Sequence, residues 1–132
     1  MTKRIFKDTG AHLPDYCRPT GDILARLGEK WVIPIFGHLK DGPLRFSELA
    51  EDIEGISERM LTMSLRSLER DGLIDRSVLP TAPPRVEYAL SERGKSLMPA
   101  LFGLHAWAEE HNAGIEQSRR DFDAASIPSE TV

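Results

Sequence analysis

The sequence has a single cysteine and no long apolar run, and each shortage excludes a class of protein. Because Cys17 stands alone among 132 residues, neither an intramolecular disulfide nor a multi-cysteine metal site can form. The longest uncharged apolar run, Trp31–Gly37, is far shorter than the roughly 20 residues of a membrane-spanning helix. The basic start, Met1–Lys7, is not followed by an apolar stretch. We therefore expect a cytoplasmic protein without a secretory signal or a membrane partner.

Signatures of enzymes and metal sites are also missing. The histidines, His12, His38, His105 and His111, do not pair with one another or with Cys, Asp or Glu at a familiar metal-binding spacing. The chain has no glycine-rich phosphate loop, and no serine or cysteine lies within a nucleophile signature. We therefore expect no metal, no cofactor and no enzymatic activity.

The charge is unevenly distributed along the chain. A net charge of −4, from 17 basic and 21 acidic residues, argues by itself against nucleic-acid binding. Residues 40–56 and 96–132 carry −3 and −4, whereas residues 57–95 carry +1 and hold six of the twelve arginines. Salt screening limits the reach of distant charges to about 8–10 Å, so a local basic face can still bind phosphate.

The hydrophobic pattern predicts helices before and after a hairpin, which makes a mainly α fold. Short helices are expected over residues 22–27, 30–40 and 46–53. Pro34 is tolerated in the first turn of the second helix, and Ser47 is a candidate N-cap of the third.

Alternating residues follow a longer helix over 57–71. Strands around Ile74–Leu79 and Val86–Leu90 form a hairpin with a proline-rich tip. A last helix is expected over Leu97–Ala108, extending at most to Ile115, with Pro99 kinking it or marking its true start.

These elements divide the chain into three parts. We expect an N-terminal arm over residues 1–19, and a flexible tail over residues 117–132, which are poor in large apolar side chains. Between them, residues 20–116 form one domain, a winged helix-turn-helix that ends in a dimerisation helix.

The helix over 57–71 has the clearest signals at both ends. Ser57 is a natural N-cap, and Gly72 follows where a helix-ending glycine belongs. At about 100° per residue, one side is mostly apolar and the other forms an outward stripe. The stripe consists of Arg59, Thr62, Met63, Arg66 and Arg70.

Two short helices, a tight link and a hairpin make a winged helix-turn-helix. In this motif the second helix enters the DNA major groove, about 12 Å wide, with its outward side toward the bases. We expect groove contacts from Arg59, Thr62, Met63 and Arg66. Ser57 and Arg70 are expected to contact flanking phosphates, and Arg85 is the expected wing contact. The alternative is that the arginines merely form a solvated helix face.

Several motifs in order carry a resemblance to a known family. They are Leu27–Trp31, Gly42–Leu49, Ile56–Thr62, Leu65–Ile74, Pro83–Tyr88 and Leu90–Gly94. The stretch from Cys17 to about Glu110 resembles the HxlR-type winged-helix regulators of bacteria and archaea, relatives of the MarR type. The resemblance implies a DNA-binding regulator that dimerises through its N- and C-terminal helices. Pro34 departs from it, since an aliphatic residue is usual there.

Cys17 has two interpretations. The resemblance implies a cysteine near this position that senses oxidants or electrophiles, and the neighbouring Arg18 favours the reactive thiolate. The alternative is a buried structural cysteine. A sensing disulfide would have to join two subunits, because the chain has no second cysteine.

The last helix is apolar over more of its circumference than one small domain can cover. We therefore predict a homodimer interface that includes Leu101, Phe102, Leu104 and Trp107. A two-fold dimer would bind a pseudo-palindromic site on double-stranded DNA, and we expect it to act as a repressor. Two alternatives stay open. One is a protein-interaction module; the other is a regulator induced by a small molecule bound at the interface, near Trp31, Phe36 and Trp107.

Overall fold

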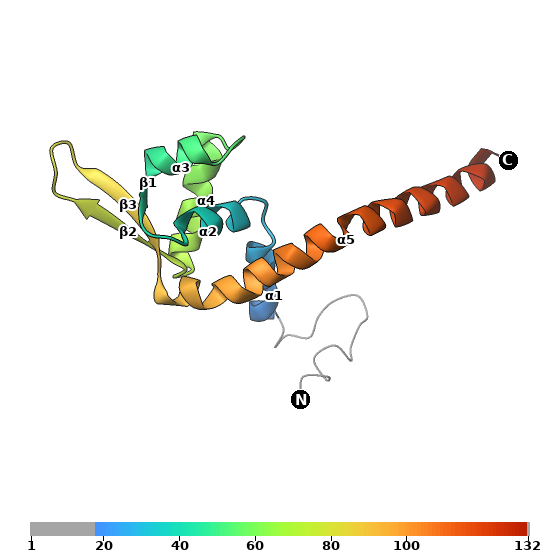
Figure 1. The fold of residues 1–132 in the computed structure, drawn as a ribbon, viewed down its shortest axis with the longest axis horizontal. Helices are drawn as coiled ribbons and strands as arrows, with labels where there is room; N and C mark the ends of the chain where they lie inside the picture. The colour runs from blue at the N-terminus through green and yellow to red at the C-terminus, as the bar shows by residue number, and fades with distance from the viewer. Residues whose placement is uncertain (1–17, 132) are drawn as a thin grey trace, which may run out of the picture. The chain divides into compact units, whose positions relative to one another are not determined.

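The computed structural model describes residues 18–131 and has eight elements. The chain divides between Ser96 and Leu97 into two compact units, which are described separately below. In order along the chain (Figure 1) the elements are α1 (Arg18–Leu27), α2 (Val32–Leu39), β1 (Leu44–Arg45), α3 (Phe46–Asp52), α4 (Glu58–Arg70), β2 (Ile74–Leu79), β3 (Arg85–Leu90) and α5 (Glu92–Thr131). The predicted mainly α fold with a small β wing is confirmed.

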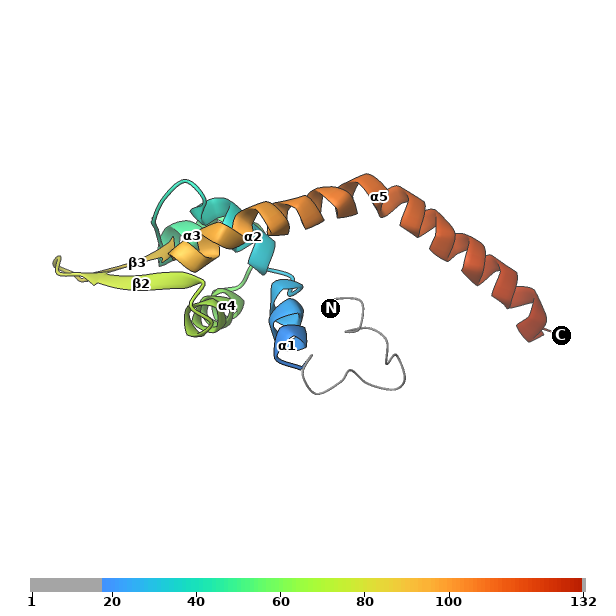
Figure 2. The same ribbon diagram turned by 90° about the horizontal axis from the view of Figure 1, so that it is seen from below.

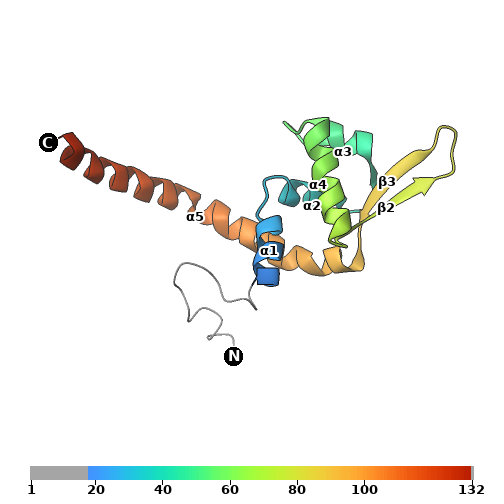
Figure 3. The ribbon, with the colours of Figure 1, turned by 180° about the vertical axis from the view of Figure 1, so that it is seen from behind.

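The sheet has one strand more than the sequence indicated. It is antiparallel with strand order β1-β3-β2, and the predicted hairpin forms its β2–β3 pair. The additional strand, β1, pairs Leu44 with Tyr88 and Arg45 with Glu87. Two residues are too few to show an alternating pattern, which is why β1 escaped prediction. The hairpin projects beyond α3 and α4 (Figures 1 and 3).

The core of the first unit lies between α2, α3, α4 and the start of the hairpin. Helix periodicity places apolar residues on the inner sides of these elements. The most completely covered side chains are Val32, Ile35, Phe36, Leu49, Leu61, Leu65, Leu68 and Ile74. Phe36 is 0% exposed and belongs to this core rather than to a surface open to a ligand.

The helix starts follow local side-chain chemistry. Ser57 is the N-cap of α4, as predicted, and its Oγ accepts a hydrogen bond from the Met60 N–H at 3.1 Å. Pro34 lies in the first turn of α2, where its missing N–H has no intrahelical partner to lose. The predicted cap of α3 is wrong, because Arg45 rather than Ser47 holds that position. The Glu48 carboxylate accepts a hydrogen bond from the Arg45 N–H at 2.8 Å and stabilises this earlier start.

Two glycines and Ser91 connect the end of α4 to the start of α5. Gly72 has a φ of +76°, which ends α4 in a conformation that favours glycine. The Ser91 hydroxyl donates to the Gly72 carbonyl at 2.6 Å and accepts from the Gly94 N–H at 3.1 Å. A Cβ atom at Gly94 would collide with the Leu73 carbonyl. These contacts fix the first turn of α5 beside the hairpin.

Helix α5 is much longer than the sequence indicated. Its 40 residues begin at Glu92, before the predicted start, and continue through the expected tail to Thr131. Pro99 lies inside the helix and does not mark its start. The strong helix formers Ala, Glu, Gln and Arg recur beyond residue 108 and favour helix there without a large apolar content. Among the described residues, no helix combines the length and apolar character needed to cross a membrane.

Candidate DNA-binding surface

The outward side of α4 is open to solvent. Leu61, Leu65 and Leu68 are buried on its inner side. The predicted stripe on the other side is exposed at every position, and Met63 retains 52% of its accessible surface. Figure 2 shows α4 at the edge of the first unit, with α2 and α3 lying to one side of it. The structure thus brings Arg59, Thr62, Met63, Arg66 and Arg70 together on one accessible helix face.

The arginines of this face keep their donors available. Within the described part of the chain, Arg59, Arg66 and Arg70 form no ion pair with a carboxylate, whereas Arg26, Arg45 and Arg85 do. A free guanidinium presents five N–H donors in a planar fork, which matches a guanine edge or a phosphate. The face is therefore suited to bind acceptor atoms of a ligand.

Ser57 stands at the positive end of the same helix. Its Oγ accepts from the Met60 N–H, so its own O–H remains free to donate. The first N–H groups of a helix lack intrahelical partners and attract negative charge. The predicted phosphate contact at Ser57 thus has suitable local chemistry.

The wing is the β2–β3 hairpin, and its residues after the tip form part of a hollow. The Thr81 hydroxyl donates to the Pro83 carbonyl at 2.7 Å and holds the proline-rich turn together. Arg85 is the first residue of β3 and lies 3.9 Å from Glu87, measured from Nη1 to Oε2. The structure therefore places the predicted wing contact at the base of the tip rather than at its end.

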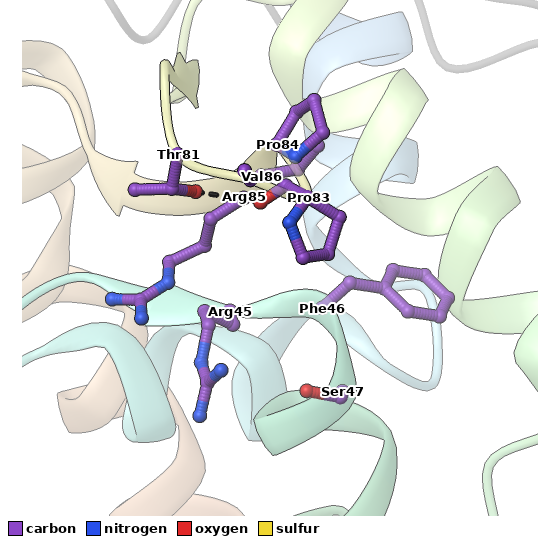
Figure 4. A pocket seen from close by; sticks show the side chains of 9 residues that line it. Arg45, Phe46, Ser47, Thr81, Pro83, Pro84, Arg85 and Val86 are labelled. Atoms are coloured by element: carbon purple, nitrogen blue, oxygen red, sulfur yellow. Dashed lines mark hydrogen bonds between the residues drawn. The ribbon is translucent and has the colours of Figure 1, made fainter.

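A hollow between the wing and the start of α3 contains an arginine that the sequence analysis missed. The hollow measures about 440 Å³ and is lined by residues 45–47 and 81–86. Because Arg45 pairs with Glu87, it lies diagonally across the sheet from Arg85 and on the same face. Figure 4 shows both guanidinium groups extending the same way. The proximity of Arg45 to Arg85 follows only from the strand register, and no pattern in the sequence indicates it.

An ion pair ties α1 to the end of α4. Arg26 Nε donates to Asp71 Oδ2 at 2.8 Å, and Arg26 Nη1 donates to Glu29 at 3.0 Å. The hydrogen bond to Asp71 is the main cause of the raised pKa of Arg26. When folding raises the pKa of a basic group, the charged group stabilises the fold at every pH below its pKa in the unfolded chain. This stabilisation is lost only as pH rises through the raised pKa. The pair therefore stays intact throughout the neutral range.

The predicted dimer residues divide by exposure. In the second unit, Leu104 and Trp107 are 62% and 52% exposed. Phe102 is half-buried, and Leu101 is already buried at 2% exposure, so Leu101 is a poor member of an intersubunit surface.

Cys17 and the rest of the predicted arm lie outside the described residues, apart from Arg18 and Pro19. Among those described, no group of three or more His, Cys, Asp or Glu side chains could hold a metal ion.

Comparison with known proteins places this architecture in a family. The HxlR-like helix-turn-helix family model matches residues 26–116. An uncharacterized HTH-type transcriptional regulator of Methanothermobacter thermautotrophicus is 49% identical over 92 residues, which cover 70% of each chain.

Solved structures agree with this match. The redox regulator HypR in its reduced form superimposes with a TM-score of 0.67 at 38% identity, covering 75% of this chain and 98% of that one. Diamide-treated YodB from Bacillus subtilis gives a TM-score of 0.65 at 37% identity, covering 71% and 93%. The Methanothermobacter relative is named as a regulator of transcription, and HypR is named as a redox regulator. The chain belongs to the HxlR-like helix-turn-helix family and is a DNA-binding transcriptional regulator.

Proposed function

We propose that the protein is a homodimeric repressor that binds a pseudo-palindromic operator in the cytoplasm. The observation that carries this proposal is the exposed face of α4, whose three arginines keep their donors free. In a helix-turn-helix, this second helix enters the major groove and the wing lies over the adjacent backbone or minor groove. Repression requires only that the bound dimer occupy DNA that a polymerase must use.

The side chains of α4 have the chemistry for direct base readout. Arg59 and Arg66 can each make a bidentate contact with guanine O6 and N7. Thr62 and Met63 offer methyl groups that pack against the thymine methyl. Ser57, Arg70 and Arg85 would then contact phosphates on either side and fix the register of the helix in the groove.

A seven-residue repeat on α5 supports the dimer. Five side chains follow one another at spacings of three, four and seven residues and share one side of the helix. They are Leu104, Ala108, His111, Ile115 and Phe122. We call these five residues the α5 stripe. Leu104 and Phe122 are 62% and 72% exposed, and a mostly apolar stripe with this spacing is typical of helices that pair. A second copy of the chain is the simplest cover.

The N-terminal helix adds a second apolar surface. Ile23 and Leu24 on α1 are 58% and 62% exposed. Covering this surface in a two-fold dimer would hold the two α4 helices in a fixed relation, about 34 Å apart for half-sites in successive major grooves. A modest change in that separation would release DNA, because both half-sites must be bound together.

We further propose that Cys17 makes this repressor responsive to oxidants. Support comes from HypR, a redox regulator solved in reduced and oxidized forms. Two Cys17 thiols, one from each subunit, would lose two electrons and two protons to diamide and form an intersubunit disulfide. A buried structural cysteine would instead leave DNA binding unchanged under oxidation.

The experiment is a gel-shift titration against DNA from upstream of the protein's own gene, with and without diamide. We expect tight binding that resists competitor DNA and weakens with salt. The proposal would be contradicted if binding to the upstream DNA were weak and unselective and a genome-wide DNA selection also yielded no preferred fragment. That result would favour a protein-interaction module.

The Cys17→Ser variant isolates the redox step. We expect it to bind the operator as the wild type does, to resist diamide, and to show no dimer-sized band on a non-reducing gel. If the variant still releases DNA in diamide, Cys17 is not the sensor.

A further inference from the structure

The hollow between the wing and α3 is a second basic site on the first unit. It brings β1 and the start of α3, which are contiguous in sequence, next to the tip of the hairpin, which comes much later in the chain. Arg45 and Arg85 both extend along it, while the Phe46 ring points the other way (Figure 4). The site is therefore a hollow with mixed polar and apolar walls, in which two guanidinium groups supply the charge.

The neighbouring carboxylates orient these arginines without using all their donors. Arg45 Nε lies 3.7 Å from Glu48, and Arg85 Nη1 lies 3.9 Å from Glu87. These single, long contacts leave most of the five N–H groups on each guanidinium free. Glu48 is committed to the Arg45 backbone N–H at 2.8 Å, which further limits its hold on the side chain.

The polar groups of the hollow favour an acceptor-rich ligand. Ser47 is exposed and has a hydroxyl that can donate a hydrogen bond. The Thr81 hydroxyl is already bound to the Pro83 carbonyl, which holds the wall opposite α3 in shape. Two guanidinium groups and one hydroxyl match the oxygens of a phosphodiester, since Arg binds phosphate in a bidentate way.

The position of the hollow identifies which phosphodiester it meets. In a helix-turn-helix the first helix, here α3, crosses the DNA backbone, and the wing reaches the DNA next to the groove that α4 occupies. We propose that Arg45, together with Arg85 and Ser47, binds one backbone phosphate between that groove and the wing. This inference rests on the proposed function, since it assumes that α4 enters the major groove. Arg45 is thus a DNA-contacting residue that fixes register without reading sequence.

The test measures the affinity of Arg45→Gln for the operator and for a random duplex across a range of salt concentrations. We expect about a tenfold loss on both DNAs and a salt slope reduced by about one, as for a single lost phosphate contact. Arg45→Lys should keep the salt slope and recover part of the affinity, because it restores the charge without the bidentate fork. Arg119→Gln on α5 is the control that removes the same charge elsewhere.

Phosphate ethylation locates the contact. One phosphate whose ethylation weakens the wild type should have no further effect on Arg45→Gln. An unchanged affinity and slope would overturn the proposal, and so would a loss confined to the operator, which indicates a base contact. If the wild type binds random DNA but selects no operator, the proposed repressor function fails while the random duplex still tests Arg45.

Discussion

At the residue scale, Arg66 is the most informative side chain of the α4 face. It is exposed near the middle of the stripe and has no ion-pair partner among the described residues. Arg66→Ala should weaken operator binding by about 1–3 kcal/mol and relax the sequence preference at one base pair, because a bidentate contact is lost. Competition of single-base operator variants against the parent sequence measures both effects.

Arg66 and Arg45 should differ in a way that separates base readout from backbone contact. Arg66→Ala is expected to lose selectivity, whereas Arg45→Gln is expected to lose affinity on every DNA. The Arg66 assignment would be wrong if the variant kept full operator affinity. A uniform loss with unchanged selectivity would instead move Arg66 to the phosphate contacts.

The two arginines also show what sequence can reveal about single residues. Arg66 was predictable because helix periodicity alone places it opposite Leu61, Leu65 and Leu68. Arg45 was not, because its proximity to Arg85 depends on the pairing of β1 with β3, residues some forty positions apart. Ser47 was misassigned for a local reason, since the Glu48 carboxylate stabilises a helix start with its N-cap two residues earlier, at Arg45.

At the element scale, Ser57 caps the start of α4, and its proposed phosphate contact can be tested separately. Ser57→Ala should lower the free energy of unfolding by about 1 kcal/mol, because the Met60 N–H loses its acceptor. Ser57→Asp should keep the cap and the stability, yet weaken DNA binding, because a carboxylate repels the nearby phosphate. Urea denaturation without DNA and a binding titration measure the two roles independently.

The matched control for Ser57 is Ser67→Ala on the same helix. The Ser67 side chain makes no hydrogen bond in the described structure, so its removal should change stability by at most about 0.5 kcal/mol. Equal stability losses for Ser57→Ala and Ser67→Ala would refute the capping role. Full DNA affinity of Ser57→Asp would remove Ser57 from the phosphate contacts.

Whole elements were predictable where their signals were local. Caps and periodicity defined α4, and alternation around a proline-rich turn defined the hairpin. The length of helix α5 is underestimated because the apolar periodicity that predicts a helix fades before the helix ends. Phe122, assigned to a flexible tail, instead extends a repeat that begins at Leu104.

At the scale of the whole molecule, the α5 stripe makes dimerisation testable apart from DNA contact. Replacing Leu104 and Phe122 together by Asp places two charges on the proposed subunit interface. We expect a chain that sediments as a monomer of 14.8 kDa rather than at twice that mass. Losing the second half-site should lower affinity for the full operator by about 100-fold or more, to that of an isolated half-site.

The control substitutes Ala106 and Ala113 by Asp on the opposite side of α5. It carries the same added charge and at least the same helix-propensity cost, yet it should remain dimeric and bind the operator normally. If both double variants dissociate, charge or helix loss rather than the stripe is responsible. If neither does, α1 with Ile23 and Leu24 must hold the subunits together, and the apolar side of α5 is free for another partner.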